Sequence, residues 1–100
     1  MEWYIAFALT LAIELPVVGL LCPPGARRRG VKDAAAANLL THPCAWWAIL
    51  SAGMSWWLVE GLVWLAEALV YRAATRLSWT RAATTSLVAN GVTAALGWLL

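Results

Sequence analysis

The sequence predicts an all-α integral membrane protein in which four transmembrane helices form a single domain of 100 residues. Of these residues, 63% are hydrophobic and only 12% are charged, and the mean hydropathy is +0.74. A typical soluble domain is about 45–50% apolar and about 25% charged. This chain therefore has too few polar side chains to cover a surface in water. The composition argues against a disordered tail, a nucleic-acid-binding module and an ordinary cytosolic enzyme.

Four apolar runs are each long enough to cross a bilayer as a helix, which takes about 20 residues. These runs cover residues 3–21, 34–53, 54–71 and 82–100. The first run has no basic start and contains Glu14, so it differs from a cleaved signal peptide. Pro23 and Pro24 end it, because proline cannot continue the hydrogen-bond ladder of a helix. We expect Asp33 to cap the second helix.

Every basic residue falls in one of two loops between these runs, 22–33 and 72–81. The seven are Arg27, Arg28, Arg29, Lys32, Arg72, Arg76 and Arg81. The positive-inside rule places both loops in the cytoplasm, so both termini and the uncharged middle loop lie outside a bacterial inner membrane. We expect the seven cationic side chains to meet anionic lipid headgroups. The lipid bilayer is therefore a predicted partner, and nucleic acid is not.

Most aromatic residues lie toward the predicted outer ends of the helices. They are Trp3, Tyr4, Trp46, Trp47, Trp56, Trp57 and Trp98. Amphipathic rings prefer the level of the lipid headgroups, so we interpret them as an aromatic belt; a surface that contacts lipid or pigment is the alternative. Cys22 and Cys44 lie at different depths, and a disulfide between them is not expected.

The two halves of the chain resemble each other. The segment 11–14 aligns with 64–67, so that Glu14 matches Glu67, and the segment 37–41 aligns with 89–93. Each half is then a hairpin with a glutamate in its first helix and Ala-Asn-x-x-Thr in its second. Because both hairpins start outside, the repeat is parallel and predicts a pseudo-two-fold axis along the membrane normal.

Polar side chains within the predicted bilayer form a candidate site: Glu14, Asn38, His42, Glu60, Glu67, Tyr71 and Asn90. A charge at the centre of a membrane helix costs at least about 2.5–3.5 kcal/mol. Three carboxylates with no basic partner in the bilayer must therefore be protonated, paired with each other or bound to a cation. The rise of an α-helix places Glu14, His42 and Asn90 at one depth. Helical spacing places Glu60, Glu67 and Tyr71 on one face.

Two interpretations of the polar side chains within the predicted bilayer stay open. Its amides and hydroxyls are typical of side chains that hydrogen-bond helices together in membranes: Asn38, Thr41, Ser86, Asn90 and Thr93. His42 is expected to pair with a carboxylate. The group Glu14, His42 and Glu67 could instead act on a ligand, because two carboxylates and one imidazole suit a divalent metal ion of intermediate hardness or a proton relay.

The residues that carry a family resemblance are Glu14–Val18, Asn38–Pro43, Val59–Glu60, Glu67–Ala68, Tyr71 and Ala89–Asn90. This pattern is similar to a group of small bacterial membrane proteins of about this length, and it covers nearly the whole chain. The resemblance implies four helices and no particular activity or cofactor. A glutamate midway along the first of four helices also resembles the small multidrug resistance transporters. Their signature in helices two and three, Pro-x-Gly-x-Ala-Tyr-Ala-x-Trp, is absent here.

Three functions compete. The favoured one is a non-enzymatic accessory or structural subunit of a larger membrane complex, respiratory or photosynthetic, or a homo-oligomer, because the loops are short and four helices enclose little interior. The alternative is a cation- or proton-linked transporter or a metal-binding protein that uses Glu14, His42 and Glu67. The third is an intramembrane enzyme with His42 as base, although no nucleophile elbow, HExxH motif or aspartate pair accompanies it. The sequence identifies no cofactor.

Overall fold

The computed structural model describes residues 3–99, with side chains up to residue 96; the predicted belt residue Trp98 and the end of the predicted fourth span lie outside the described side chains. The helices are α1 (Trp3–Leu21), α2 (Arg27–Leu50), α3 (Trp56–Ala73) and α4 (Trp79–Leu99), with a 3-10 turn at Pro24–Ala26. No strand occurs among the described residues. The predicted all-α fold of four helices is confirmed.

The first basic segment is more helical than the sequence predicts. α2 begins at Arg27 rather than at residue 34, so Asp33 lies inside the helix and the expected cap is wrong. Arginine and lysine are good helix formers, and the helix therefore begins as soon as the chain leaves the 3-10 turn. Asp33 instead accepts a hydrogen bond of 2.7 Å from the Thr75 hydroxyl across the bundle. α3 and α4 also extend into the second basic segment, which leaves residues 74–78 as its connection.

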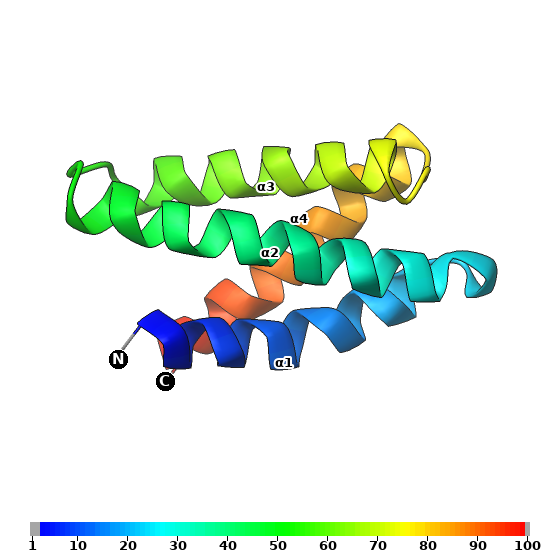
Figure 1. Cartoon of the computed structure of the whole chain (residues 1–100), viewed down its shortest axis with the longest axis horizontal. Helices are drawn as coiled ribbons and strands as arrows, with labels where there is room; N and C mark the ends of the chain where they lie inside the picture. Colours follow the sequence, from blue (N-terminus) through cyan, green and yellow to red (C-terminus); the bar gives the residue numbers. More distant parts are fainter. Residues whose placement is uncertain (1–2, 100) are drawn as a thin grey trace.

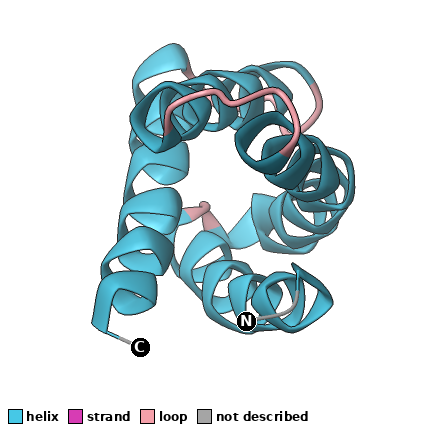
Figure 2. Cartoon of the chain, turned by 90° about the vertical axis from the view of Figure 1, so that its left-hand side faces the viewer, coloured by secondary structure: helices cyan, strands magenta, loops and turns pink. Residues whose placement is uncertain are grey.

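Each helix packs against two others: α1 and α3 both contact α2 and α4. Figure 1 shows both termini and the α2–α3 connection at one end of the bundle, which we call the open end. The α1–α2 and α3–α4 connections lie at the opposite end, which we call the basic end. Figure 2 looks along the bundle from the open end. The helices thus follow one another around the bundle in the order α1, α2, α3, α4. A two-fold axis between the hairpins requires this order, because the rotation places α1 on α3 and α2 on α4.

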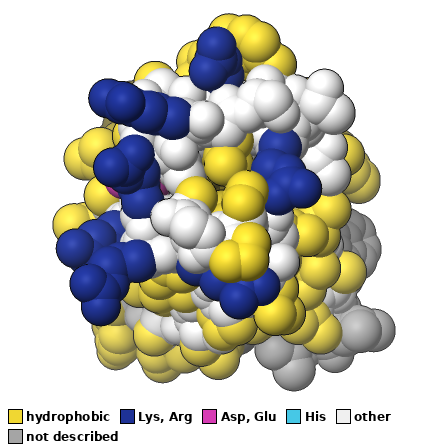
Figure 3. Space-filling model, turned by 90° about the vertical axis from the view of Figure 1, so that its right-hand side faces the viewer, with side chains coloured by type: hydrophobic (Ala, Val, Ile, Leu, Met, Phe, Trp, Pro, Cys, Tyr) yellow, Lys and Arg dark blue, Asp and Glu magenta, His cyan; other side chains and the backbone are white. Residues whose placement is uncertain are grey.

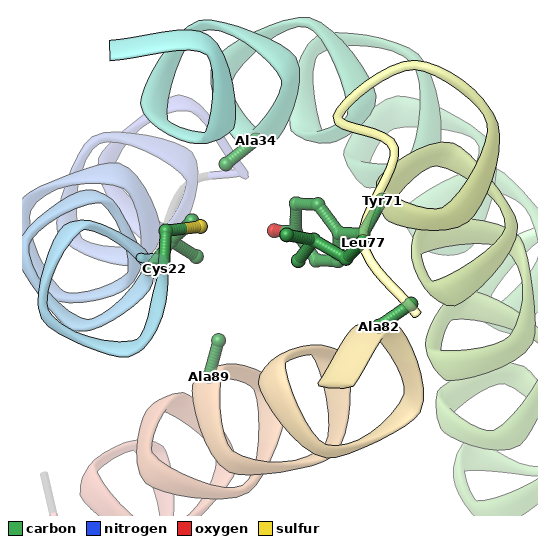
Figure 4. Packing of buried hydrophobic residues seen from close by; sticks show 7 residues of the cluster. Cys22, Ala34, Tyr71, Leu77, Ala82 and Ala89 are labelled. Carbon is green, nitrogen blue, oxygen red and sulfur yellow. The ribbon is translucent and has the colours of Figure 1, made fainter. Parts of the chain in front are cut away.

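Small and aromatic side chains fill the bundle toward the basic end. Figure 4 shows Tyr71 and Leu77 pointing across the interior toward Cys22 and Ala34. Cys22, the residue after α1, comes very close to α2 here, since a Cβ atom at Gly30 would lie 2.5 Å from the Cys22 sulfur. Burial also raises the pKa of the Cys22 thiol. This half of the bundle is closed by tight packing.

The side walls of the bundle are largely apolar. The exposed fractions of Leu20, Leu40 and Leu50 are 77%, 72% and 71%. Figure 3 shows lysine and arginine side chains around the basic end, with hydrophobic side chains between them. Among the described helices, only α1 is both long and apolar enough by composition to cross a membrane. The four membrane spans therefore stay a prediction.

Candidate functional site

Two buried glutamates at the centre of the bundle accept hydrogen bonds in the same pattern. Glu14 of α1 accepts one from the Asn38 amide at 2.7 Å and one from the Thr93 hydroxyl at 3.4 Å. Glu67 of α3 accepts one from the Asn90 amide at 3.0 Å and one from the Thr41 hydroxyl at 3.2 Å. Each carboxylate thus binds an asparagine of its own hairpin and a threonine of the other hairpin. We call these six residues the polar layer.

The backbone contacts of the layer repeat as well. The Asn38 amide also donates to the Ala34 carbonyl at 2.8 Å, and the Asn90 amide donates to the Ser86 carbonyl at the same distance. These bonds to the preceding helical turn fix each asparagine with an N–H group facing its glutamate. The internal repeat inferred from the sequence therefore has a physical counterpart, in which equivalent residues perform equivalent tasks in the two hairpins.

A cavity of about 580 Å³ lies between the helices on the open-end side of the polar layer. Its polar lining residues are Thr10, Glu14, Asn38, Thr41, His42, Glu60, Asn90 and Thr93. Trp46, Trp56 and Trp57 also line it, and Trp57 is 74% exposed. Glu67 does not line this cavity, although it matches Glu14 in every layer contact. Glu67 lies one hydrogen bond behind the lining, because its partners Thr41 and Asn90 both line the cavity.

The predicted site residues separate into three positions along the bundle. Glu14, Asn38, Glu67 and Asn90 meet in the polar layer. His42 and Glu60 lie in the cavity. Tyr71 lies in the closed half, fully buried, and its hydroxyl has no hydrogen-bond partner in the part of the chain that the structure describes.

His42 does not make the predicted carboxylate pair. Its ring packs against the rings of Phe7 and Trp46, with centroid distances of 5.1 and 6.2 Å. Its buried Nε2 atom has no hydrogen-bond partner among the described residues. Within residues 3–96, no three His, Cys, Asp or Glu side chains are grouped closely enough to hold a metal ion. The layer carboxylates take neutral amide and hydroxyl partners in place of the imidazole.

Sequence reasoning missed part of the cavity lining. Thr10 had no signal, because one threonine in an apolar helix is common. Trp46, Trp56 and Trp57 were assigned to an aromatic belt, yet they also line the cavity. Trp56 precedes Glu60 by one helical turn, and this spacing places both side chains on one face of α3. This spacing in the sequence could have indicated that Trp56 lies in the same site as Glu60.

The ionisable side chains that line the cavity are mostly acidic. Among the described residues, Glu14 and Glu60 contribute carboxylates, His42 contributes an imidazole, and no lysine or arginine belongs to the lining. Indole rings near the mouth add negative π-faces, which attract cations. A site with this lining favours a positively charged ligand. Comparison with family models, with curated proteins and with solved structures found no match for this chain, so its function is inferred from this geometry.

Proposed function

We propose that this chain is a four-helix integral membrane protein that binds a monovalent organic cation in the cavity at its open end, as the binding step of a transporter. The observation that carries the proposal is the cavity itself, whose lining in the described part of the chain has two carboxylates, three indole rings and no basic residue except His42. Two parallel hairpins related by a pseudo-two-fold axis along the membrane normal form the bundle that holds the site.

Several features support membrane insertion. The longest dimension of the bundle is 39 Å, close to the roughly 40–45 Å of a bilayer with its headgroups. The basic loops lie together at one end, as the positive-inside rule expects of cytoplasmic loops. The polar layer lies inside the bundle, and leucine side chains cover the outside. Ionisable groups in membranes face the bundle interior in this way.

The choice of an organic cation follows from what the cavity lacks and what it contains. A divalent metal ion needs several ligands at fixed distances, and the described side chains provide no such cluster. A volume of about 580 Å³ falls within the range of about 300–1,000 Å³ typical of small-molecule sites. Ammonium and guanidinium groups combine charge attraction to carboxylates with attraction to indole faces.

Cation binding can be measured by calorimetry and tryptophan fluorescence on the full chain in nanodiscs. The probes are tetraphenylphosphonium, tetramethylammonium and guanidinium. We expect saturable binding of at least one probe, and Glu14→Gln should weaken it by at least about tenfold, equivalent to about 1.4 kcal/mol. The matched control is Glu67→Gln, which removes the equivalent carboxylate outside the cavity and should leave the affinity within about twofold.

Three outcomes would contradict the proposal. The wild-type chain could bind none of the three probes, or Glu14→Gln could bind them as tightly as the wild type. The third is an equal loss of affinity in the two glutamine variants, because the carboxylate that lines the cavity would then have no specific role. Uptake of the bound probe into proteoliposomes then separates a transporter from a protein that only binds.

Cys44 provides an independent test of membrane insertion. Its side chain is exposed on α2, whereas Cys22 is buried. In intact vesicles, a membrane-impermeant maleimide should leave Cys44 unmodified, because lipid covers it, and should modify it after denaturation. Rapid modification of Cys44 in the native vesicles would place this face of α2 in water.

The polar layer also supports a second candidate function, that of an accessory subunit of a membrane complex. Both layer carboxylates already have partners inside the bundle, and these hydrogen bonds join all four helices. The layer is thus suited to hold a small scaffold together. The mass of the particle extracted in mild detergent tests this function: a larger complex or an oligomer supports it, and a stable monomer contradicts it.

A further inference from the structure

A groove at the basic end combines apolar and cationic side chains. It lies between the end of α1 and the start of α2 and has a volume of about 660 Å³. Its apolar lining residues are Pro16, Gly19, Leu20 and Val31. Its cationic lining residues are Arg27, Arg28 and Lys32. The groove is separate from the cavity at the open end, with which it shares no lining residue.

Two of the three cationic side chains of the groove form a strip on the surface of α2. Arg28 and Lys32 are four residues apart, so they lie on the same face of the helix, and both are exposed. No side chain caps the first turn of α2, where free backbone N–H groups carry partial positive charge. No acidic residue lines the groove. These features favour an anion at this point.

The neighbouring depression does not offer the same chemistry. It shares Arg28 and Lys32 with the groove, but Asp33 adds a negative charge to its lining. Its other lining residues are Gly25, Ala26 and Arg29, so it has none of the leucine, valine and proline side chains of the groove. The other basic segment has different contacts: Arg72 lies over the ring of Trp79 at 5.2 Å, and Arg81 reaches the Leu21 carbonyl at 3.5 Å. The seven basic residues are therefore not equivalent.

We propose that this groove binds an anionic phospholipid. The phosphate contacts Arg27, Arg28 and Lys32, and an acyl chain lies along the apolar residues of α1. Only an amphiphile satisfies both parts, because a free phosphate would leave the apolar lining uncovered. The inference rests on the proposed membrane insertion, and it narrows the general expectation of headgroup contacts to three of the seven cationic residues.

Gly19 gives the groove a feature that can be changed without altering charge. A Cβ atom at this position would lie 3.4 Å from the Val31 side chain, at the near limit of ordinary van der Waals contact. A leucine at position 19 would therefore add its bulk to the groove, whereas an alanine would add only one methyl group. Gly19→Leu and Gly19→Ala form a matched pair.

Native mass spectrometry of the full chain tests the proposal. The protein is released from nanodiscs containing equal amounts of phosphatidylglycerol and phosphatidylcholine, and retained lipids are counted. We expect preferential retention of phosphatidylglycerol by the wild type and by Gly19→Ala. Retention should fall at least about tenfold in Arg27→Gln/Arg28→Gln/Lys32→Gln and in Gly19→Leu. The control Arg29→Gln/Arg76→Gln/Arg81→Gln loses the same charge at the same end and should retain the lipid.

Several results would overturn the site. Equal losses in both triple variants would indicate general attraction to the basic end, and full competition by glycerol phosphate or inorganic phosphate would indicate a site for soluble phosphates. Undiminished retention by Gly19→Leu would exclude the groove. Alkaline extraction separates this failure from failure of the proposed function: a soluble chain contradicts membrane insertion, whereas a membrane-bound chain without phosphatidylglycerol contradicts only the lipid site.

Discussion

The α1–α2 and α3–α4 hairpins contribute the same residue types to the polar layer. They differ in the residues next to that layer. Each provides a glutamate, an asparagine and a threonine to the polar layer. At the position that matches Glu60, however, the first hairpin has Phe7, and at the position that matches His42 the second hairpin has Ala94. Phe7 packs on His42, whereas Glu60 lines the cavity.

The shared polar residues join the four helices, and five of the six also line the cavity; the unlike residues make the two hairpins differ beside it. Residues that recur in both hairpins satisfy each other and join the four helices. Of the residues that occur once, Glu60 and His42 line the cavity, and of the two shared glutamates Glu14 lines it and Glu67 does not. Toward the basic end, Val18 and Tyr71 are another unlike pair at matching positions, and both are fully buried.

The largest effect is expected from the shared asparagines. Asn38→Leu and Asn90→Leu each leave a buried glutamate without its amide partner. An unsatisfied buried polar group costs about 1–3 kcal/mol, so each variant should lower the free energy of unfolding by about this amount, as measured by denaturation in detergent. If one variant were neutral and the other strongly destabilised, the two hairpins would not be equivalent.

An intermediate effect is expected from Glu60→Phe, which gives the second hairpin the residue of the first. The ring would occupy part of the cavity and remove one of its two carboxylates. Affinity for the cationic probe should fall by about tenfold or more, equivalent to about 1.4 kcal/mol, while the melting temperature stays at or above that of the wild type. Unchanged affinity would show that Glu60 takes no part in the site.

The smallest effect is expected from Tyr71→Phe. The Tyr71 hydroxyl is buried and has no partner among the described residues, so its removal leaves no hydrogen bond broken. The free energy of unfolding should stay unchanged or rise by up to about 1 kcal/mol. A clear loss of stability would mean that a bound water or another group pairs with this hydroxyl.

The sequence predicted the helices and the composition of the polar layer because both depend on local patterns. Apolar runs mark helices, and the recurrence of Glu14 at Glu67 and of Asn38 at Asn90 marks equivalent positions. The helix starts were less accurate, since α2 begins at Arg27. Hydropathy reports where a chain is apolar, whereas arginine and lysine also favour helix in polar segments.

The partners within the site could not be predicted in the same way. Thr41 bonds the glutamate of the other hairpin rather than its own, and this choice depends on how the two hairpins pack. His42 was expected beside a carboxylate, but its ring packs against Phe7 and Trp46. Neither contact is local in the sequence, so spacing along one helix carries no information about it.

Carbon-13 NMR of the glutamate carboxyl groups tests the central claim most directly. The full chain is labelled at these carbons, and the resonances of Glu14, Glu60 and Glu67 are assigned with single glutamine variants. If the cavity binds the cation, titration with the bound probe should shift the Glu14 and Glu60 resonances and leave Glu67 close to its starting position. Equal shifts of Glu14 and Glu67, or no shift at Glu14 and Glu60, would contradict the proposal that the cation binds in the cavity.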